Sequence, residues 1–271
     1  MAASGKILRL GRIFRRSSGK TVIVALDHGR RYGPIRGIED FKRTVEILVD
    51  ANIDAIMATP AMIERVCDVI SGRIAAIARI DGTGTIKGPD PMDDRLIASV
   101  ERGLKVGADA VSVMIYVGSE READLLEKLG FVADLCFEYG MPLLAEMIPS
   151  KPFLKDPYDP ANIAYCARIG AEYGADVIKT LYSGDPRSFK DVVSSVPVPI
   201  VILGGPQKES VTDVLRMVHG AIEGGARGVA IGRNIFQSRN PKLMAQIISE
   251  IVHEGLGLEE ALKKAKEGKL S

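Results

Sequence analysis

One lysine lies in a short apolar run that has the composition of a buried β-strand. Lys179 is part of ADVIKTL, residues 175–181. Burial disfavours the charged form of an amine, and a neutral amine can attack a carbonyl carbon to form a Schiff base. A lysine in such a run can also be purely structural, paired with a carboxylate at the rim of the core. The pattern therefore indicates either an imine-forming nucleophile or a structural ion pair.

Other polar side chains stand where further apolar runs end. They are Asp27 and His28 in VALDHG, Arg79 and Asp81 in ARID, Tyr116, and Glu146. Asp27 is suited to act as a general base or to hold Lys179 in register, and His28 and Asp81 are candidates for binding substrate. Adjacent residues of a regular strand point to opposite faces, so only one of Asp27 and His28 is expected to face a shared site. We expect Asp27 to be that residue.

Two glycine-containing segments near the C-terminus indicate a phosphate site. Gly204 and Gly205 lie in LGGP (203–206), and Gly232 and Arg233 lie in AIGRNIF (230–236). Glycines allow backbone N–H groups to close on an anion, and an arginine can bind phosphate oxygens through two N–H groups. The alternative is that these glycines only form turns. We expect a phosphorylated small molecule to bind there.

Composition gives no indication of a cofactor, a metal or a macromolecular partner. The three histidines, His28, His219 and His253, are far apart, and the glycine-rich stretch 81–88 lacks the dinucleotide-binding fingerprint. Lys and Arg total 36 against 35 Asp and Glu, so the net charge of +1 would not attract nucleic acid or anionic lipid. No apolar run has the length of a membrane span, and the N-terminus resembles no export signal. We therefore expect a cytoplasmic protein that needs neither cofactor nor metal.

Eight short β-rich runs must position these side chains, and amphipathic stretches separate them. The runs are residues 20–26, 54–58, 74–80, 109–115, 141–147, 175–181, 199–203 and 228–232. Continuous apolar strands joined by helices indicate a parallel sheet covered on its outside. Eight such units predict an α/β fold of one (β/α)8 TIM barrel, with a doubly wound open sheet as the alternative. In a barrel, the carboxyl ends of the strands converge on one mouth, which would bring the polar side chains together.

The chain shows no linker or change of composition that would divide it. We expect residues 1–271 to form one barrel domain, with residues 1–19 as an N-terminal cap segment and residues 257–271 as a C-terminal helix.

Several motifs together resemble those of the archaeal-type class I aldolase family. They are TVIVALDHG, GADAVSV, GADVIKT, VPIVILGGP and GVAIGRNIFQ, and the resemblance runs from about residue 7 to residue 265. The family includes fructose-bisphosphate aldolase of the DhnA type and 2-amino-3,7-dideoxy-D-threo-hept-6-ulosonate synthase, a transaldolase of archaeal aromatic biosynthesis. The N-terminal motifs are more similar to the synthase.

The resemblance implies a barrel that cleaves or forms a carbon–carbon bond in a phosphorylated ketose. It assigns Lys179 as the Schiff-base lysine and Asp27 as the acid/base carboxylate. Phosphate binding is implied for Gly204, Gly205, Gly232 and Arg233. The resemblance also implies homo-oligomeric rings of five or ten subunits, with a phosphorylated sugar or aldehyde as the substrate.

One catalytic position of the family is altered in this chain. The family has a tyrosine in a Tyr-Pro-Arg-Gly-like segment, whereas the chain reads EMIPSKPF with Ile148 there. Glu146 lies on the same face of the strand and Tyr116 lies on the preceding strand, so either can replace the tyrosine as proton donor. We favour Glu146, because a buried carboxylate near Lys179 would pair with it and titrate near neutral pH. The alternative is that Glu146 only balances the charge of Lys179 or Arg79.

Two other classes of protein use the same elements. A flavin-binding barrel oxidoreductase also holds a phosphate between the last two strand ends. A sugar-phosphate sensor could retain the barrel and lose catalysis with the tyrosine. The expected function is a fructose-bisphosphate aldolase-like enzyme, with the synthase-type transaldolase as the next alternative.

Overall fold

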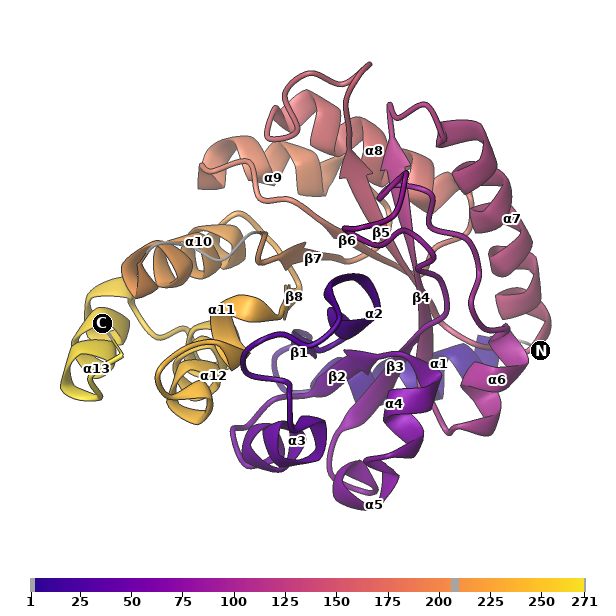
Figure 1. The fold of residues 1–271 in the computed structure, drawn as a ribbon. Coiled ribbons are helices and arrows are strands. Elements are labelled where there is room, and N and C mark those ends of the chain that lie inside the picture. The colour runs from indigo at the N-terminus through magenta and orange to yellow at the C-terminus, as the bar shows by residue number, and fades with distance from the viewer. Residues whose placement is uncertain (1–2, 206–209, 271) are drawn as a thin grey trace.

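A closed barrel of eight parallel strands forms the centre of the molecule (Figure 1). The computed structural model describes residues 3–205 and 210–270. The strands are β1 (Thr21–Ala25), β2 (Ala55–Ala58), β3 (Ala75–Arg79), β4 (Ala110–Val117), β5 (Leu143–Pro149), β6 (Val177–Thr180), β7 (Ile200–Leu203) and β8 (Gly228–Ile231). The strands pair in chain order, and β1 also pairs with β8, with Val24 opposite Ile231. This closure confirms the predicted TIM barrel and excludes the open sheet.

Helices surround the barrel. They are α2 (Gly29–Tyr32), α3 (Phe41–Val49), α4 (Pro60–Glu64), α5 (Cys67–Ile70), α6 (Val100–Lys105), α7 (Glu122–Glu138), α8 (Pro160–Glu172), α9 (Pro186–Ser194), α10 (Val211–Glu223), α11 (Arg233–Phe236) and α12 (Pro241–Ser249). Several begin at a side-chain cap followed by proline: Asp159 accepts a hydrogen bond from the Ala161 amide, and Asp185 from the Ser188 amide. No helix in the described part of the chain is long and apolar enough to cross a membrane.

The strands alternate between two separate apolar clusters, as the period of two in a β-strand requires. Residues of one parity, such as Val22 and Val24, pack outward against the helices. Residues of the other parity, such as Ile23, Ile77 and Leu144, pack together inside the barrel. The interior positions nearer the carboxyl ends of β3, β5 and β6 are charged rather than apolar. This change of side-chain type along the inward face creates the site.

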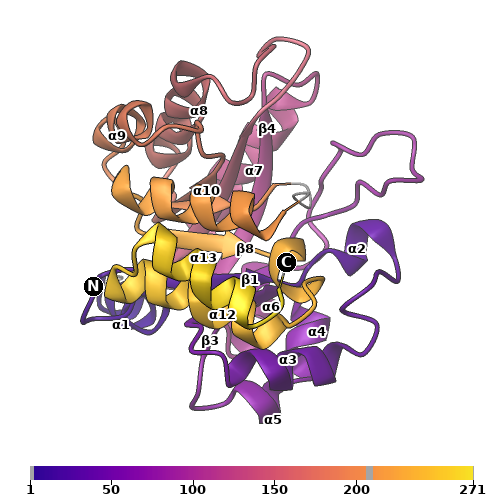
Figure 2. The same cartoon turned by 90° about the vertical axis from the view of Figure 1, so that its left-hand side faces the viewer.

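The N-terminal helix covers the end of the barrel away from these charges, and the C-terminal helix packs on the outside. Helix α1 (Ala3–Ile13) lies at the amino ends of the strands, opposite α2 (Figure 2). Ile13 packs into the interior cluster, and Lys6 Nζ lies 2.8 Å from Asp176 Oδ2 at the start of β6. A π-helix, η1 (Glu250–Glu254), follows α12, and α13 (Leu258–Glu267) packs on α10 and α12. The N-terminal helix thus packs on one end of the barrel, and the charged side chains lie at the opposite mouth.

Candidate active site

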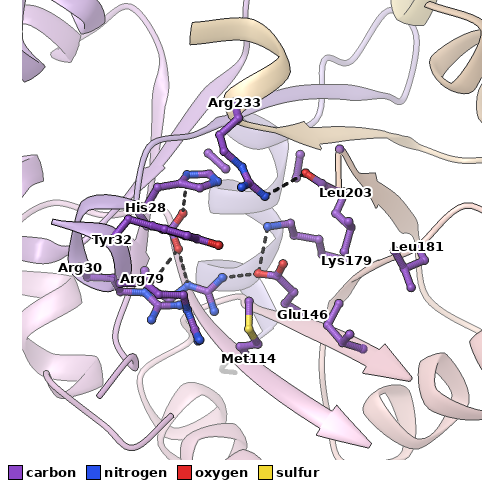
Figure 3. Close-up of a pocket in the computed structure, with 18 of the residues that line it drawn as sticks. His28, Arg30, Tyr32, Arg79, Met114, Glu146, Lys179, Leu181, Leu203 and Arg233 are labelled. Atoms are coloured by element: carbon purple, nitrogen blue, oxygen red, sulfur yellow. Dashed lines mark hydrogen bonds and ion pairs between the residues drawn. The ribbon is translucent and has the colours of Figure 1, made fainter. Parts of the chain in front are cut away.

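A cavity of about 360 Å³ opens at the carboxyl ends of the strands (Figure 3). The candidate residues that line it are Asp27, His28, Tyr116, Glu146, Lys179, Gly204, Gly205, Gly232 and Arg233. They come from six of the eight strand ends or the loops that follow them. The fold therefore brings together residues that are more than 200 positions apart in the sequence.

Lys179 and Glu146 form a buried ion pair in this cavity. The register of β5 and β6 places the two residues directly opposite each other on neighbouring strands. Lys179 Nζ lies 2.9 Å from Glu146 Oε2, and the side chains are only 5% and 7% exposed. A pair at this distance can pass a proton directly from the ammonium to the carboxylate.

Glu146 is an ionised carboxylate in the resting site, and the expectation that it titrates near neutral pH is wrong. Burial by itself raises the pKa of Glu146, but the nearby charges of Lys179 and Arg79 outweigh burial, so the pKa lies below its usual value. Arg79 Nη2 also donates a hydrogen bond to Glu146 Oε2. In this state Glu146 can accept a proton from Lys179 but has none to donate.

Arg79 links the carboxylates of the site and has no solvent exposure. Its Nε donates to Asp27 Oδ2 at 3.0 Å, and its Nη1 donates to Asp81 Oδ1 at 3.2 Å. Burial opposes the charge of Arg79, but Glu146, Asp27 and Asp81 raise its pKa well above the usual value. The guanidinium therefore fixes the separation and orientation of three carboxylates.

Asp81 does not reach the cavity wall, contrary to its expected role in binding substrate. Its Oδ2 accepts hydrogen bonds from Lys128 Nζ at 2.6 Å and from the Met114 amide at 2.7 Å, and the side chain is fully buried. The strand β3 ends at Arg79, so the alternation that would have turned Asp81 inward is lost. Asp81 therefore binds Arg79 from outside the cavity and helps to hold its guanidinium in place.

Asp27 and His28 both line the cavity, so the expectation that only one would do so is also wrong. Strand β1 ends at Ala25, and the chain turns into α2 after His28, which removes the constraint of strand alternation. Burial raises the pKa of Asp27, but Arg79, His28, Arg30 and Lys179 together hold it well below its usual value. Asp27 is therefore a carboxylate in contact with Arg79.

His28 is neutral at pH 7. Burial lowers its pKa below the ordinary value of 6.5; Asp27 opposes this shift, whereas Lys179 and Arg233 reinforce it. Among the described residues, His28 Nδ1 has no hydrogen-bond partner. It is a buried polar atom beside the cavity and is available to a ligand.

The free energy of unfolding should therefore fall as the pH is lowered from 7.5 to 5.5. The unfolded chain takes up a proton at His28 more readily than the folded chain does, so the stability present above pH 6.5 is lost on acidification. Urea unfolding at both pH values measures this difference. In His28→Asn the pH dependence should be smaller, and an unchanged difference would contradict a neutral His28.

Gly204, Gly205, Gly232 and Arg233 lie together beyond the ends of β7 and β8, where the sequence predicts a phosphate site. Gly205 has a φ of 65°, which favours glycine, and its carbonyl oxygen accepts a hydrogen bond from Arg233 Nη2 at 3.3 Å. A Cβ at Gly232 would lie 2.5 Å from the Ala25 carbonyl oxygen, so only glycine fits between the loop and β1. Arg233 Nε is buried without a hydrogen-bond partner in the described part of the chain. An arginine N–H directed at a cavity between glycines is suited to bind a phosphate.

Pro206, the last residue of the predicted LGGP segment, lies outside the described residues.

Tyr116 stands beside the altered family position. The register of β4 and β5 pairs Tyr116 with Ile148, and both line the cavity. The Tyr116 hydroxyl accepts a hydrogen bond from Arg31 Nη2 at 2.9 Å. Burial raises the pKa of Tyr116 further above its usual value, so the phenol keeps its proton and can donate it.

The cavity also contains residues that the sequence patterns did not single out. Arg30, Arg31 and Tyr32 enter it from α2, and Met114 and Leu181 contribute apolar surface. In the sequence these residues form the segment RRY, one residue after His28. The short helix α2, which places them at the mouth of the barrel, has no periodic pattern that would predict it. Among the described residues, no three His, Cys, Asp or Glu side chains are grouped so that they could hold a metal ion.

The fold and the site together define a class of protein: TIM-barrel enzymes with a buried lysine at the end of strand six and with glycines and an arginine at the ends of strands seven and eight. The chain belongs to the DeoC/LacD family of aldolases, which matches residues 21–238. It is thus an enzyme of the carbon–carbon lyases or of the closely related transaldolases. This assignment confirms the resemblance seen in the sequence motifs.

Curated relatives and solved structures agree with this assignment. The chain is 38% identical over 259 residues to 2-amino-3,7-dideoxy-D-threo-hept-6-ulosonate synthase 1 of Archaeoglobus fulgidus, covering 96% of this chain and 95% of the relative. It is 35% identical over 252 residues to 2-amino-4,5-dihydroxy-6-oxo-7-(phosphonooxy)heptanoate synthase of Streptomyces griseus, covering 93% and 92%.

An archaeal fructose 1,6-bisphosphate aldolase has the same fold, with a TM-score of 0.83 and 31% identity. The match covers 92% of this chain and all of that one. Another structure of such an aldolase, with a TM-score of 0.83 and 30% identity over 92% of this chain and 99% of that one, has its catalytic lysine covalently bound to a carbinolamine intermediate.

Proposed function

We propose that this enzyme forms and cleaves a carbon–carbon bond through an imine between Lys179 and a ketose phosphate. The observation that carries the proposal is the buried Lys179–Glu146 pair, at 2.9 Å, inside a cavity that is also lined by Arg233, whose Nε has no hydrogen-bond partner among the described residues. The family assignment favours this function over the flavin oxidoreductase and the sensor.

Glu146 would supply the proton transfers that make the imine. It accepts a proton from the Lys179 ammonium, and the free amine attacks the ketone carbon to give a carbinolamine. Once Lys179 has lost its charge, one of the two cations that depress the pKa of Glu146 is gone, and the protonated carboxyl becomes an effective acid. It then protonates the carbinolamine hydroxyl, which leaves as water. This sequence gives Glu146 the role of the missing tyrosine, with the phenol of Tyr116 as the alternative donor.

Asp27 would act on the bond that is broken. In cleavage it removes the proton of the substrate hydroxyl, the carbon–carbon bond opens, and the protonated imine takes up the electron pair as an enamine. The aldehyde leaves, and the enamine is protonated in a lyase or attacks a second aldehyde in a transaldolase. Arg79, bound to both Asp27 and Glu146, would hold the two carboxylates at fixed positions on either side of the reacting carbons.

The chemical names of the relatives indicate the substrate class. In 2-amino-4,5-dihydroxy-6-oxo-7-(phosphonooxy)heptanoate, the hydroxyl on carbon 4 and the ketone on carbon 6 mark an aldol bond between carbons 4 and 5. Opening that bond gives dihydroxyacetone phosphate and an amino-acid aldehyde. Fructose 1,6-bisphosphate opens to the same ketone and glyceraldehyde 3-phosphate. We therefore assign a dihydroxyacetone phosphate-type donor, and we place the amino-acid aldehyde first as acceptor because the synthases are more similar to this chain.

The acceptor can be identified by incubating the enzyme with dihydroxyacetone phosphate and either aspartate 4-semialdehyde or glyceraldehyde 3-phosphate. Mass spectrometry should detect a phosphorylated seven-carbon amino acid with the first acceptor, formed faster than the six-carbon bisphosphate with the second. Fructose 1,6-bisphosphate as the faster product would reverse the order of the two substrates. No product with either acceptor would contradict the proposed donor.

Arg233→Gln tests the phosphate site. The KM for dihydroxyacetone phosphate should rise about 10- to 100-fold, because one charged hydrogen-bond donor to phosphate is lost. The kinetic constants for unphosphorylated dihydroxyacetone should not change, and neither should those of the control Arg216→Gln, which alters an exposed side chain of α10. Equal losses with both ketones would show that Arg233 does not recognise phosphate.

We also propose that the enzyme is a cytoplasmic homo-oligomer of five or ten subunits, as the sequence motifs imply. Large side chains support a covered surface on α7 and α8: Phe131, Phe137 and Tyr165 are 57%, 69% and 55% exposed. Light scattering of the purified protein would give its mass, and a monomer would contradict the oligomer.

A further inference from the structure

The side of the cavity away from the phosphate loops carries a second group of cations. Arg30 and Arg31 belong to α2, and Arg31 contacts Tyr116 on β4 and Asp94 in the segment after β3. In a barrel of eight strands, β3 and β4 lie across from β7 and β8. Figure 3 accordingly shows Arg30 at one end of the cavity and Arg233 and Leu203 at the other.

The Nε–H of Arg30 lacks a hydrogen-bond acceptor among the described residues. Its side chain is only 7% exposed, yet no described residue forms a hydrogen bond with its Nε. The nearest carboxylate oxygen, Asp27 Oδ2, is 3.7 Å from Nε, and Asp27 is already bound by Arg79 at 3.0 Å. Arg30 also packs on Gly82, where a Cβ would lie 2.5 Å from Arg30 Cδ, so its stem is confined. A buried guanidinium N–H that has no acceptor lowers the free energy of unfolding, and a ligand that accepts its hydrogen bond removes this cost.

The charges at this end fit a singly charged anion. Arg30 and Arg31 share one carboxylate, Asp94, whose two oxygens lie 3.4 Å from Arg30 Nη1 and 2.5 Å from Arg31 Nη2. Asp27 also lies 3.7 Å from Arg30 Nε, but it is shared with Arg79. The linked network holds five cations and four carboxylates, so one positive charge remains: Arg30, Arg31, Arg79, Lys128 and Lys179 against Asp27, Asp81, Asp94 and Glu146. The protonated hydroxyl of Tyr116 adds a neutral donor beside Arg31. A carboxylate would balance this charge, whereas a phosphate dianion would add a second negative charge close to Asp94 and Asp27.

We infer that Arg30 and Arg31, together with the Tyr116 hydroxyl, form a second anion subsite that binds the carboxylate of the acceptor aldehyde. This inference rests on the proposed function. The donor would be held by its phosphate at the loops after β7 and β8 and by its ketone carbon at Lys179, so the new bond extends toward β3 and β4. The acceptor's carboxylate would then reach Arg30 and Arg31, which act as specificity-determining residues for acceptors with an acid group.

The test compares two acceptors of similar length, 4-oxobutanoate and butanal, with dihydroxyacetone phosphate as the donor. In Arg30→Gln and, separately, in Arg31→Gln, the KM for 4-oxobutanoate should rise about 10- to 100-fold, as expected from the loss of one charged hydrogen bond. The KM for butanal should stay the same. Arg36→Gln is the matched control, because Arg36 follows the same helix but lies outside this cavity and bonds the Gln237 carbonyl oxygen.

Borohydride trapping of the donor separates this inference from the proposed function. Variants that still form the dihydroxyacetone phosphate adduct but show equal KM changes for both acceptors would overturn the carboxylate subsite. A larger change for glyceraldehyde 3-phosphate than for 4-oxobutanoate would also overturn it, since the subsite would then take phosphate. Loss of the adduct in both variants would show that the arginines are needed for imine formation with the donor, and it would also overturn the carboxylate subsite. Failure of the wild-type enzyme to form any adduct would contradict the proposed function itself.

Discussion

Lys179→Met is expected to reduce turnover by about 10⁴-fold or more while leaving the protein folded. Methionine has a similar length but no amine, so the covalent step has no nucleophile. The fold should survive because Glu146 keeps its hydrogen bond to Arg79 and is not left as an unpaired buried charge. The measurement is steady-state turnover, with circular dichroism to establish folding.

The matched control for this variant is Lys87→Met, which removes an exposed lysine in the loop after β3. Its turnover should equal that of the wild type. A rate for Lys179→Met within tenfold of the wild type would remove the imine from the mechanism and leave Lys179 as a structural partner of Glu146.

Glu146→Gln is expected to lower turnover by about 10²- to 10⁴-fold, the range of a general acid–base group. The amide can accept a hydrogen bond from Lys179, but it cannot take the proton that must leave the amine or return it to the carbinolamine hydroxyl. Turnover of the variant should therefore rise more steeply with pH than that of the wild type, since hydroxide can replace the missing base. The pH profile of kcat distinguishes this role from a merely structural one.

Ile148→Val is the companion to this variant, because it changes the neighbouring inward residue at the family's tyrosine position. Its effect should be small, since valine removes one methylene and no proton-transfer group. Similar small effects of both substitutions would show that Glu146 does not transfer the proton. Tyr116, which is paired with Ile148, would then be the remaining candidate for the proton donor.

The sequence predicts the barrel and most of the cavity because the inward residues of a strand recur with a period of two. Ala75, Ile77 and Arg79 show this: two apolar residues fill the interior, and the third reaches the mouth. Likewise Leu144 packs inside the barrel and Glu146 points into the cavity. Such positions can be read from the strand pattern alone.

The remaining features depend on where strands end and how they are staggered. His28 faces the cavity only because β1 stops at Ala25, and Asp81 turns away because β3 stops at Arg79. The low pKa of Glu146 depends on the register that sets it opposite Lys179 and on the reach of Arg79 across the barrel. Arg30 and Arg31 line the cavity only because α2 lies over the mouth of the barrel. These are tertiary effects, and local sequence does not encode them separately.

Borohydride trapping of the imine tests directly whether Lys179 is the nucleophile. The enzyme is treated with borohydride in the presence of dihydroxyacetone phosphate, and the intact mass and peptide masses are then measured. We expect a stable adduct on the peptide that contains Lys179, absent from Lys179→Met. An adduct on another lysine, or no adduct with this donor or with fructose 1,6-bisphosphate, would contradict an imine at Lys179.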